Sequence, residues 1–196
     1  WSPEDQDDAL WYRCKHDVAL FALQCFGERF KHPWNELHEF LLHRPDLVEQ
    51  QRLAAVREVL GPSGWKLAWR DRTRERRDAI VAPRGHAKST IVSWLDIIHD
   101  VVFGFEVCVA LVSVDKRTSD QLVKDLHEVF TQPDTYPELH ASYGPFKVIG
   151  SMTDFSVFCA SSGNPFGTNI LSYTVRGSIR GHKWRGWRPS KVVFDD

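Results

Sequence analysis

The sequence has 196 residues, of which 42% are hydrophobic and 26% are charged, and its formal net charge is -1. This length and composition suit one domain with a substantial core, and the near-zero charge excludes a strong overall attraction to nucleic acid. No apolar run approaches the ~20 residues that a membrane span needs, and the acidic start at Glu4 to Asp8 is unlike a signal peptide. We therefore expect a soluble domain, and the start at Trp1 without Met suggests a piece of a longer chain.

Residues 1–60 are predicted to be an N-terminal helical segment packed on the core. Apolar residues recur at helical spacing in three stripes that Pro33 and Pro45 interrupt. The stripes are Val18, Phe21, Ala22, Cys25 and Phe26, then Leu37, Phe40 and Leu41, then Leu53, Val56 and Leu60. A Gly-Pro-Ser-Gly turn at 61–64 then opens the second predicted part, residues 61–196.

The stretch from Ala82 to Thr90 has the character of a phosphate-binding loop. Ala79 to Val81 predicts a short buried strand before it, and apolar residues recur at helical spacing after it until Gly104. A strand, a tight loop and a helix in this order direct several backbone N–H groups toward one anion. We expect Lys88 to contact the β and γ phosphates of ATP and the Ser89 hydroxyl to ligate Mg²⁺, although an ordinary strand-to-helix turn is the alternative.

The following residues predict an α/β fold with a mostly parallel sheet flanked by helices. Residues 107–112 form a continuous apolar strand, and Thr118 and Gln121 have the spacing of a helix capping box. The expected buried face of that helix consists of Leu122, Leu126, Val129 and Phe130. Residues 131–146 are expected to be a surface excursion, and 155–160 and 170–175 further strands.

The cysteines and histidines give no sign of a metal site or of a disulfide framework. The cysteines are at positions 14, 25, 108 and 159, without C-x-x-C spacing, and the nine histidines are scattered singly. This pattern favours core thiols in a reducing cytoplasm.

Residues 191–196 form the second half of the predicted ATP site. Lys191 to Phe194 predicts a strand, and paired carboxylates, Asp195 and Asp196, follow it. In a P-loop ATPase the first carboxylate holds the Mg²⁺ shell and the next activates the attacking water. We therefore expect Asp195 near the metal and Asp196 near the water.

Three stretches of this sequence resemble the ATPase domain of the large terminase subunit, the DNA-packaging motor of tailed bacteriophages. The stretches are Pro83-Arg84-Gly85-His86-Ala87-Lys88-Ser89-Thr90, Gly177-Ser178-Ile179-Arg180-Gly181, and residues 188–196. Two positions depart from the family pattern. Ala87 replaces a frequent glycine, and Asp196 stands where many members carry a catalytic Glu, so either this shorter carboxylate or a residue past Asp196 has that role.

The resemblance implies an ASCE-type P-loop NTPase that uses ATP and Mg²⁺, with Arg84 sensing the γ phosphate within its own subunit. It implies a homo-oligomeric ring that translocates double-stranded DNA into a procapsid, with the portal protein and the small terminase subunit as partners. The expected location is the cytoplasm of the bacterial host, with transient docking on the procapsid. The core would be truncated after the Asp195 strand, with a nuclease domain further along the chain.

The segment from Arg176 to Lys191 has four Arg, two Lys and no acid, with Trp184 and Trp187 between them. Basic residues interleaved with aromatic rings suit a nucleic-acid groove. In a ring of ATPases an arginine from this segment, Arg180 above all but also Arg185 or Arg188, could instead enter the neighbouring active site. Ion pairs with acids of a nearby helix are the structural alternative.

Two other functions remain open at this point. A helicase-like, nucleic-acid-dependent ATPase shares both halves of the site. Because Ala87 and Asp196 depart from the pattern, a nucleotide-binding or DNA-binding module with little turnover is the other alternative.

Overall fold

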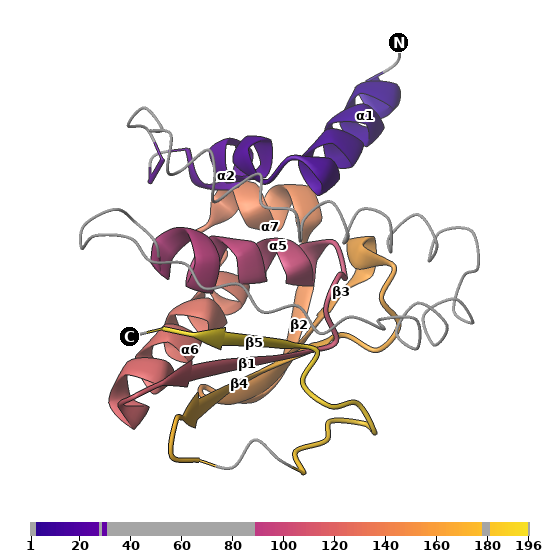
Figure 1. Ribbon diagram of the computed structural model, residues 1–196. Coiled ribbons are helices and arrows are strands. Elements are labelled where there is room, and N and C mark those ends of the chain that lie inside the picture. Colours follow the sequence, from indigo (N-terminus) through magenta and orange to yellow (C-terminus); the bar gives the residue numbers. More distant parts are fainter. Residues whose placement is uncertain (1–2, 28, 31–88, 178–180, 196) are drawn as a thin grey trace. The chain divides into compact units, whose positions relative to one another are not determined.

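The computed structural model describes residues 3–27, 29–30, 89–177 and 181–195 (Figure 1). The chain divides into two compact units, and the unit from Trp34 to Lys88 lies outside the described residues. The elements of the other unit are α1 Pro3–His16, α2 Val18–Phe26, the π-helical η1 Thr90–Leu95, α5 Asp96–Val102, β1 Cys108–Ser113, α6 Lys116–Thr131, α7 Pro137–Tyr143, β2 Phe146–Ser151, β3 Asp154–Cys159, the 3₁₀ helix η2 Ala160–Ser162, β4 Thr168–Thr174 and β5 Lys191–Phe194.

The five described strands form one mixed sheet in the order β2-β3-β4-β1-β5. Strand β1 lies between β4 and β5, is parallel to both, and is buried along its whole length, as the continuous apolar run predicts. The prediction of a mostly parallel sheet is wrong for the other side, where β2, β3 and β4 pair antiparallel. A two-residue turn at Met152 and Thr153 joins β2 to β3, and so short a connection permits only antiparallel pairing.

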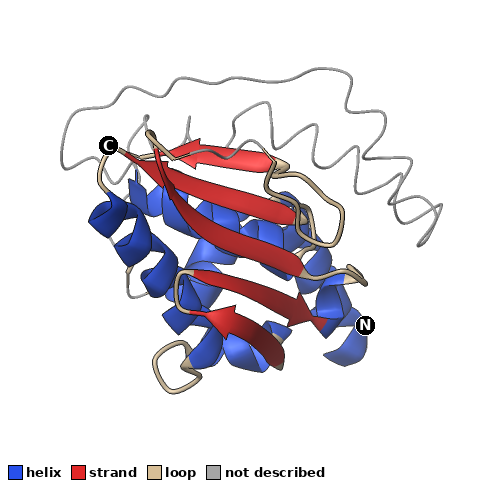
Figure 2. Cartoon of the chain, turned by 90° about the horizontal axis from the view of Figure 1, so that it is seen from below, coloured by secondary structure: helices blue, strands red, loops and turns tan. Residues whose placement is uncertain are grey.

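The described helices pack on one face of this sheet. Seen from below, the strands lie in front of the helices (Figure 2). In Figure 1 α5 lies above β5, and α6, at the left, contacts β1, β2, β3 and β4. The opposite face is crossed by the connection from β4 to β5, from which Trp184 packs on Cys108, Ala110 and Leu171. The described residues of the crossover contain no helix, so within this part of the chain the sheet has a helical layer on one side and an extended loop on the other.

The helix that follows the predicted phosphate loop ends where the sequence indicates. After α5, Gly104 adopts a left-handed φ of 66°. Gly104 N donates to Val101 O over 3.3 Å and Phe105 N donates to Asp100 O over 2.8 Å, which is the Schellman pattern of helix termination. The prediction of a stop at Gly104 is confirmed.

The first N-terminal stripe is also confirmed, since α2 buries the five predicted residues. Asp17 caps the helix by accepting a hydrogen bond from Leu20 N over 2.9 Å. Phe21 is fully buried and makes edge-to-face contacts with Phe103, just after α5, and with Tyr143 of α7. These contacts attach the N-terminal helices to the helical layer that covers the sheet. All four cysteines are buried, as expected of core thiols.

Three local predictions need correction. Helix α6 begins at Lys116, two residues before the expected cap Thr118, and it buries Val123 where Leu122 was expected. The region 131–146 contains α7, which buries Leu139 and Tyr143, and the start of the unpredicted strand β2. The stripes at 37–41 and 53–60 and the strand at 79–81 lie outside the described residues. Within the described ranges, no helix combines the length and apolarity that crossing a bilayer requires.

Candidate phosphate and metal site

Ser89 and Asp195, the two residues predicted to ligate Mg²⁺, are hydrogen-bonded to each other. Ser89 Oγ donates to Asp195 Oδ1 over 2.8 Å, although 106 positions separate the two residues in the chain. Asp195 is 6% exposed, and its backbone N–H donates to Val112 O over 2.9 Å. A hydroxyl and a carboxylate are oxygen ligands of the kind that Mg²⁺ prefers, so this pair fits one side of a magnesium site.

The alternation of β5 decides which side chain reaches Ser89. Lys191 and Asp195 lie on the face of the strand that carries α5, with the buried Val193 between them. Val192 and Phe194 face the other way and are 40% and 69% exposed. Because side chains alternate, a slip of one residue in this register would turn Asp195 away from the helix.

Ser190 fixes that register at the beginning of the strand. Its backbone N–H donates to Cys108 O over 2.8 Å, and its hydroxyl donates to the same carbonyl over 2.9 Å. From there Lys191 pairs with Val109 and Phe194 with Val112, in parallel. The ladder therefore brings the carboxyl end of β5 beside the end of β1, where parallel strands in α/β folds place their ligands.

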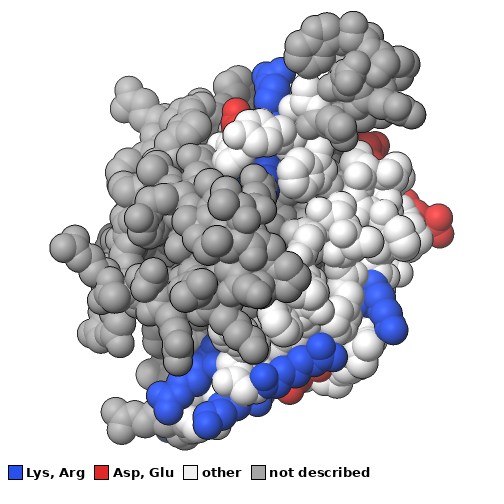
Figure 3. Space-filling model, turned by 90° about the vertical axis from the view of Figure 1, so that its right-hand side faces the viewer, with Lys and Arg blue, Asp and Glu red and all other residues white. Residues whose placement is uncertain are grey.

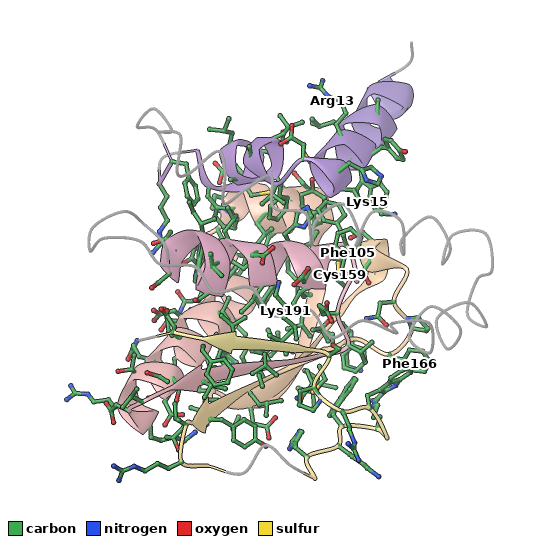
Figure 4. The ribbon with its side chains drawn as sticks, viewed as in Figure 1. Arg13, Lys15, Phe105, Cys159, Phe166 and Lys191 are labelled. Carbon is green, nitrogen blue, oxygen red and sulfur yellow. The ribbon has the colours of Figure 1, made fainter. Side chains whose placement is uncertain are left out.

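A buried ion cluster lies at the other end of β5. Lys191 Nζ lies 2.7 Å from Asp96 Oδ2 and 2.5 Å from Asp100 Oδ2, and both carboxylates belong to α5. Figure 4 labels Lys191 between β5 and α5. The Lys191 side chain is 14% exposed, and those of Asp96 and Asp100 are 4% and 0% exposed. Glu106, 2% exposed, adds a third carboxyl group to this region. The cluster was not predicted, although two acids four apart in the apolar helix sequence Asp-Ile-Ile-His-Asp were a signal of a buried partner.

The cluster shifts the proton affinities of its members. Burial raises the pKa of Asp100 to about 8, and the positive charge of Lys191 opposes this shift, whereas Asp96 and Glu106 add to it. Burial lowers the pKa of Lys191, but the charges of Asp100 and Asp96 outweigh burial, so the net direction is upward. Lys191 is therefore a permanent cation, and Asp100 holds a proton over much of the neutral range.

His99 lies between the two acids in sequence but faces the N-terminal helices. Its Nε2 lies 3.0 Å from Cys14 O, and the ring packs against Phe21 and Phe103. Burial lowers the pKa of His99 to about 4, although the hydrogen bond to Cys14 acts in the other direction. The imidazole is therefore neutral at physiological pH, and Nε2 donates its proton to the carbonyl.

The basic crossover folds into a tight hairpin at Trp184 to Trp187. The two tryptophans exchange backbone hydrogen bonds of 2.9 and 2.8 Å, and Arg185 and Gly186 have φ of 49° and 88°, as in a type I′ turn. Arg185 occupies a left-handed conformation that non-glycine residues rarely adopt. Its guanidinium lies 5.3 Å from the centre of the Phe158 ring and 5.0 Å from that of Trp184.

The cations of this crossover have no acidic partner in the described part of the chain. Lys183, Arg185 and Arg188 are exposed, and none lies within 4.0 Å of a described carboxylate. The space-filling view shows Lys and Arg side chains along the lower rim of the molecule, the side on which the crossover runs (Figure 3). A shallow pocket of about 470 Å³ includes Phe158, which Arg185 covers, and Lys147. These residues form a cationic surface with aromatic rings in it. The alternative of ion pairs with a nearby helix holds for Lys191, at the end of the basic segment, which pairs with Asp96 and Asp100 of α5, but not for Lys183, Arg185 or Arg188 among the described acids.

Several predicted site residues lie outside the described residues. They are Pro83, Arg84, Gly85, His86, Ala87, Lys88, Arg180 and Asp196. Ser89 and Thr90 are described, at the start of the helix that leads into α5. In the part of the chain that is described, no group of three His, Cys, Asp or Glu side chains is arranged to hold a metal ion. A Mg²⁺ ion held by Ser89 and Asp195 would therefore need further oxygen ligands from outside the described side chains, such as phosphate or water oxygens.

Comparisons with known proteins found no relative of this chain. Neither the models of known protein families, nor curated proteins, nor solved structures match this chain.

Proposed function

We propose that this chain is a P-loop ATPase and that its Mg-ATP site includes Ser89 and Asp195. The observation that carries the proposal is the hydrogen bond between these two residues. Ser89 follows the Lys88 of the loop sequence and opens a helix, whereas Asp195 ends an apolar strand a whole α/β unit later. Two halves of one motif that meet in space support a shared ligand better than either half alone.

Each residue of the proposed site would have a separate role in ATP hydrolysis. Bound Mg²⁺ would neutralise charge on the β and γ phosphates. Ser89 Oγ and the Asp195 carboxylate would hold the metal, and Lys88 and Arg84 would contact the phosphates. Asp196, or a residue past it, would orient the water that attacks the γ phosphorus, with ADP as the leaving group. Catalysis of this kind depends mainly on positioning and on electrostatic stabilisation.

A comparison of single variants tests this assignment. Lys88→Ala and Asp195→Asn should each lower ATP hydrolysis by about 100-fold or more, because each removes a preorganised charge from the phosphate site. Asp134→Asn is the matched control, since Asp134 is an exposed carboxylate in the loop after α6. If the parental protein hydrolyses ATP no faster than the two site variants, the chain is not an ATPase, and a binding module with little turnover becomes the better assignment.

We further propose that hydrolysis drives movement of double-stranded DNA, as in a viral DNA-packaging terminase. The support is the resemblance of the loop and of residues 177–181 and 188–196, together with Lys183, Arg185 and Arg188 of the crossover, which pair with none of the described carboxylates. The role would include a homo-oligomeric ring docked on a procapsid. A helicase-like ATPase shares this support, and strand-separation activity on a forked duplex would favour it.

The DNA contact is tested by exchanging matched pairs of charges. Arg185→Gln with Arg188→Gln should weaken DNA binding and lower the slope of log affinity against log salt by about 0.9 for each DNA phosphate that an arginine no longer neutralises. The control pair, Arg117→Gln with Lys124→Gln, removes two charges from α6, which lies on the other face of the sheet. If the two double variants bind DNA equally well and with equal salt slopes, the crossover is not part of the DNA-binding surface.

A further inference from the structure

The helix after the phosphate loop contacts β5 at two separate points. At one end Ser89 bonds Asp195, and at the other Lys191 bonds Asp96 and Asp100. Along β5 the contacts run from Lys191 to Asp195, whereas along the helical segment the partners run in the reverse order, from the two aspartates back to Ser89. The helical segment and the strand therefore run in opposite directions between the two contacts.

The contact of Lys191 with Asp96 and Asp100 is unusual inside a protein core. Lysine is among the residues least often buried, and an apolar side chain at the same place would avoid the loss of hydration of the ammonium group and of the carboxyl groups beside it. A charged pair, however, tolerates only one arrangement, because a shift of either element leaves a buried charge without its partner. An apolar contact would tolerate sliding of the strand along the helix, whereas the lysine fixes one register.

Strand β5 needs such a fixed point. It has four residues, and within the described part of the chain it pairs with one neighbour, β1. Val193 contributes its one fully apolar buried side chain, since Val192 and Phe194 are exposed. From its described contacts alone, we expect this short strand to open more readily than β1, and Asp195 would move with it.

We propose that Lys191 is a positioning residue that anchors β5 to α5 and thereby holds the Asp195 carboxylate against the Ser89 hydroxyl. The effect on the strand follows from the contacts alone. The effect on catalysis rests on the proposed ATPase function, because Asp195 matters to hydrolysis only if it holds Mg²⁺. Lys191 itself touches neither of the proposed metal ligands.

The test uses a variant in which the whole cluster, Glu106 included, is neutral. Lys191→Met alone leaves buried carboxylates without a counter-ion and is expected to fold poorly, so Lys191→Met is combined with Asp96→Asn, Asp100→Asn and Glu106→Gln. The matched control is Leu126→Ala, which creates a cavity on α6, away from β5 but under the same sheet. Both proteins lose stability, and only the first loses the anchor.

Exchange of backbone N–H hydrogens, followed by NMR, measures how readily β5 opens and requires no ATP. The N–H of Asp195 is bonded to Val112 O in the β1–β5 ladder, and the N–H of Val175 is bonded to Ser113 O beside β4. The ratio of the Asp195 exchange rate to the Val175 exchange rate should rise tenfold or more in the neutral-cluster variant and stay within twofold of the parental value in Leu126→Ala. An unchanged ratio in the neutral-cluster variant, or an equal rise in the control, would overturn the proposal.

ATP hydrolysis then separates this proposal from the proposed function. The neutral-cluster variant should need at least threefold more Mg²⁺ for half-maximal activity, whereas Leu126→Ala should keep the parental requirement. A parental protein without ATPase activity, together with the expected rise in the exchange ratio, would reject the ATPase assignment and leave the anchor intact. Parental ATPase activity with an unchanged Mg²⁺ requirement in the neutral-cluster variant would reject the effect of Lys191 on the metal site.

Discussion

Replacing Asp100 by Asn removes a titrating carboxyl group from the buried cluster while preserving its shape. The Asp100 side chain is fully buried, and Lys191, Asp96 and Glu106 lie in its surroundings. Burial raises its pKa from 3.8 to about 8, so at pH 7 the folded protein holds a proton on this group that the unfolded chain has released. Asn resembles the protonated carboxyl, which makes the variant a neutral copy of the form present at pH 7.

The sign and size of the effect follow from proton linkage. Between about pH 4 and pH 8 the folded state binds one proton more than the unfolded state at Asp100, so stability falls as the pH rises. The slope approaches about 1.4 kcal/mol per pH unit, so the loss from about pH 6.5 to pH 8 is on the order of 1 to 2 kcal/mol. His99 acts in the opposite direction, because its pKa is lowered from 6.5 to about 4 and its contribution to stability is lost as the pH falls through that range. Of these two groups, only Asp100 changes the free energy of unfolding with pH above about pH 6.5.

Urea unfolding of the parental protein and of Asp100→Asn at four pH values between about 6.5 and 8 measures this difference. The parental free energy of unfolding should fall across the series relative to that of Asp100→Asn. The comparison cancels groups that titrate equally in both proteins, such as exposed histidines. Two curves that run parallel across this range would refute the reasoning, because Asp100 would then have the same charge in the folded and unfolded states.

Three further predictions concern the fold and the proposed ring. Gly104→Ala should lower the free energy of unfolding by roughly 1 to 3 kcal/mol, because Gly104 has a φ of 66° and a Cβ there would lie 2.8 Å from Asn164 Cβ. Gly163→Ala is its control in thermal denaturation, since Gly163 has a φ of 65° with no atom within 4 Å of the new Cβ, and an equal loss would exclude the packing cause. Phe21→Ala should cost about 3 to 5 kcal/mol in urea unfolding, since a fully buried ring that packs on Phe103 and Tyr143 is removed; a decrease below about 1 kcal/mol would show that α2 contributes little to the core. In a mixing assay, Arg180→Ala and Lys88→Ala subunits that are each inactive should partly restore ATP hydrolysis if Arg180 acts in the neighbouring subunit, and no recovery at any ratio would contradict that role.

The sequence by itself determined the elements whose residues carry a strong periodic or local signal. The α2 stripe, the apolar β1 run and the stop at Gly104 are confirmed, because burial of one face and a left-handed glycine are requirements that each segment meets from its own residues. The candidate pair Ser89 and Asp195 was also identified from the sequence, since each residue stands at the edge of a recognisable half-motif. Their role in binding Mg²⁺ stays a prediction.

Helix α7 and strand β2 carried too weak a local signal to be found. The seven-residue α7 lies among Pro, Tyr and Gly, and what stabilises it is the burial of Leu139 and Tyr143 against other elements. Strand β2 is largely exposed and gains its hydrogen bonds from β3. Short elements of this kind depend on tertiary packing more than on propensity.

Only the tertiary structure decided what the charged residues of the core contact. Nothing in the residues around Lys191 indicates that its ammonium meets Asp96 and Asp100, which lie more than 90 positions earlier in the chain. The crossover from β4 to β5 and its parallel register against β1 bring these groups together. Periodicity reports which face of an element is buried, but the partner across that face is set by how the chain returns to the sheet, and that return is a property of the whole fold.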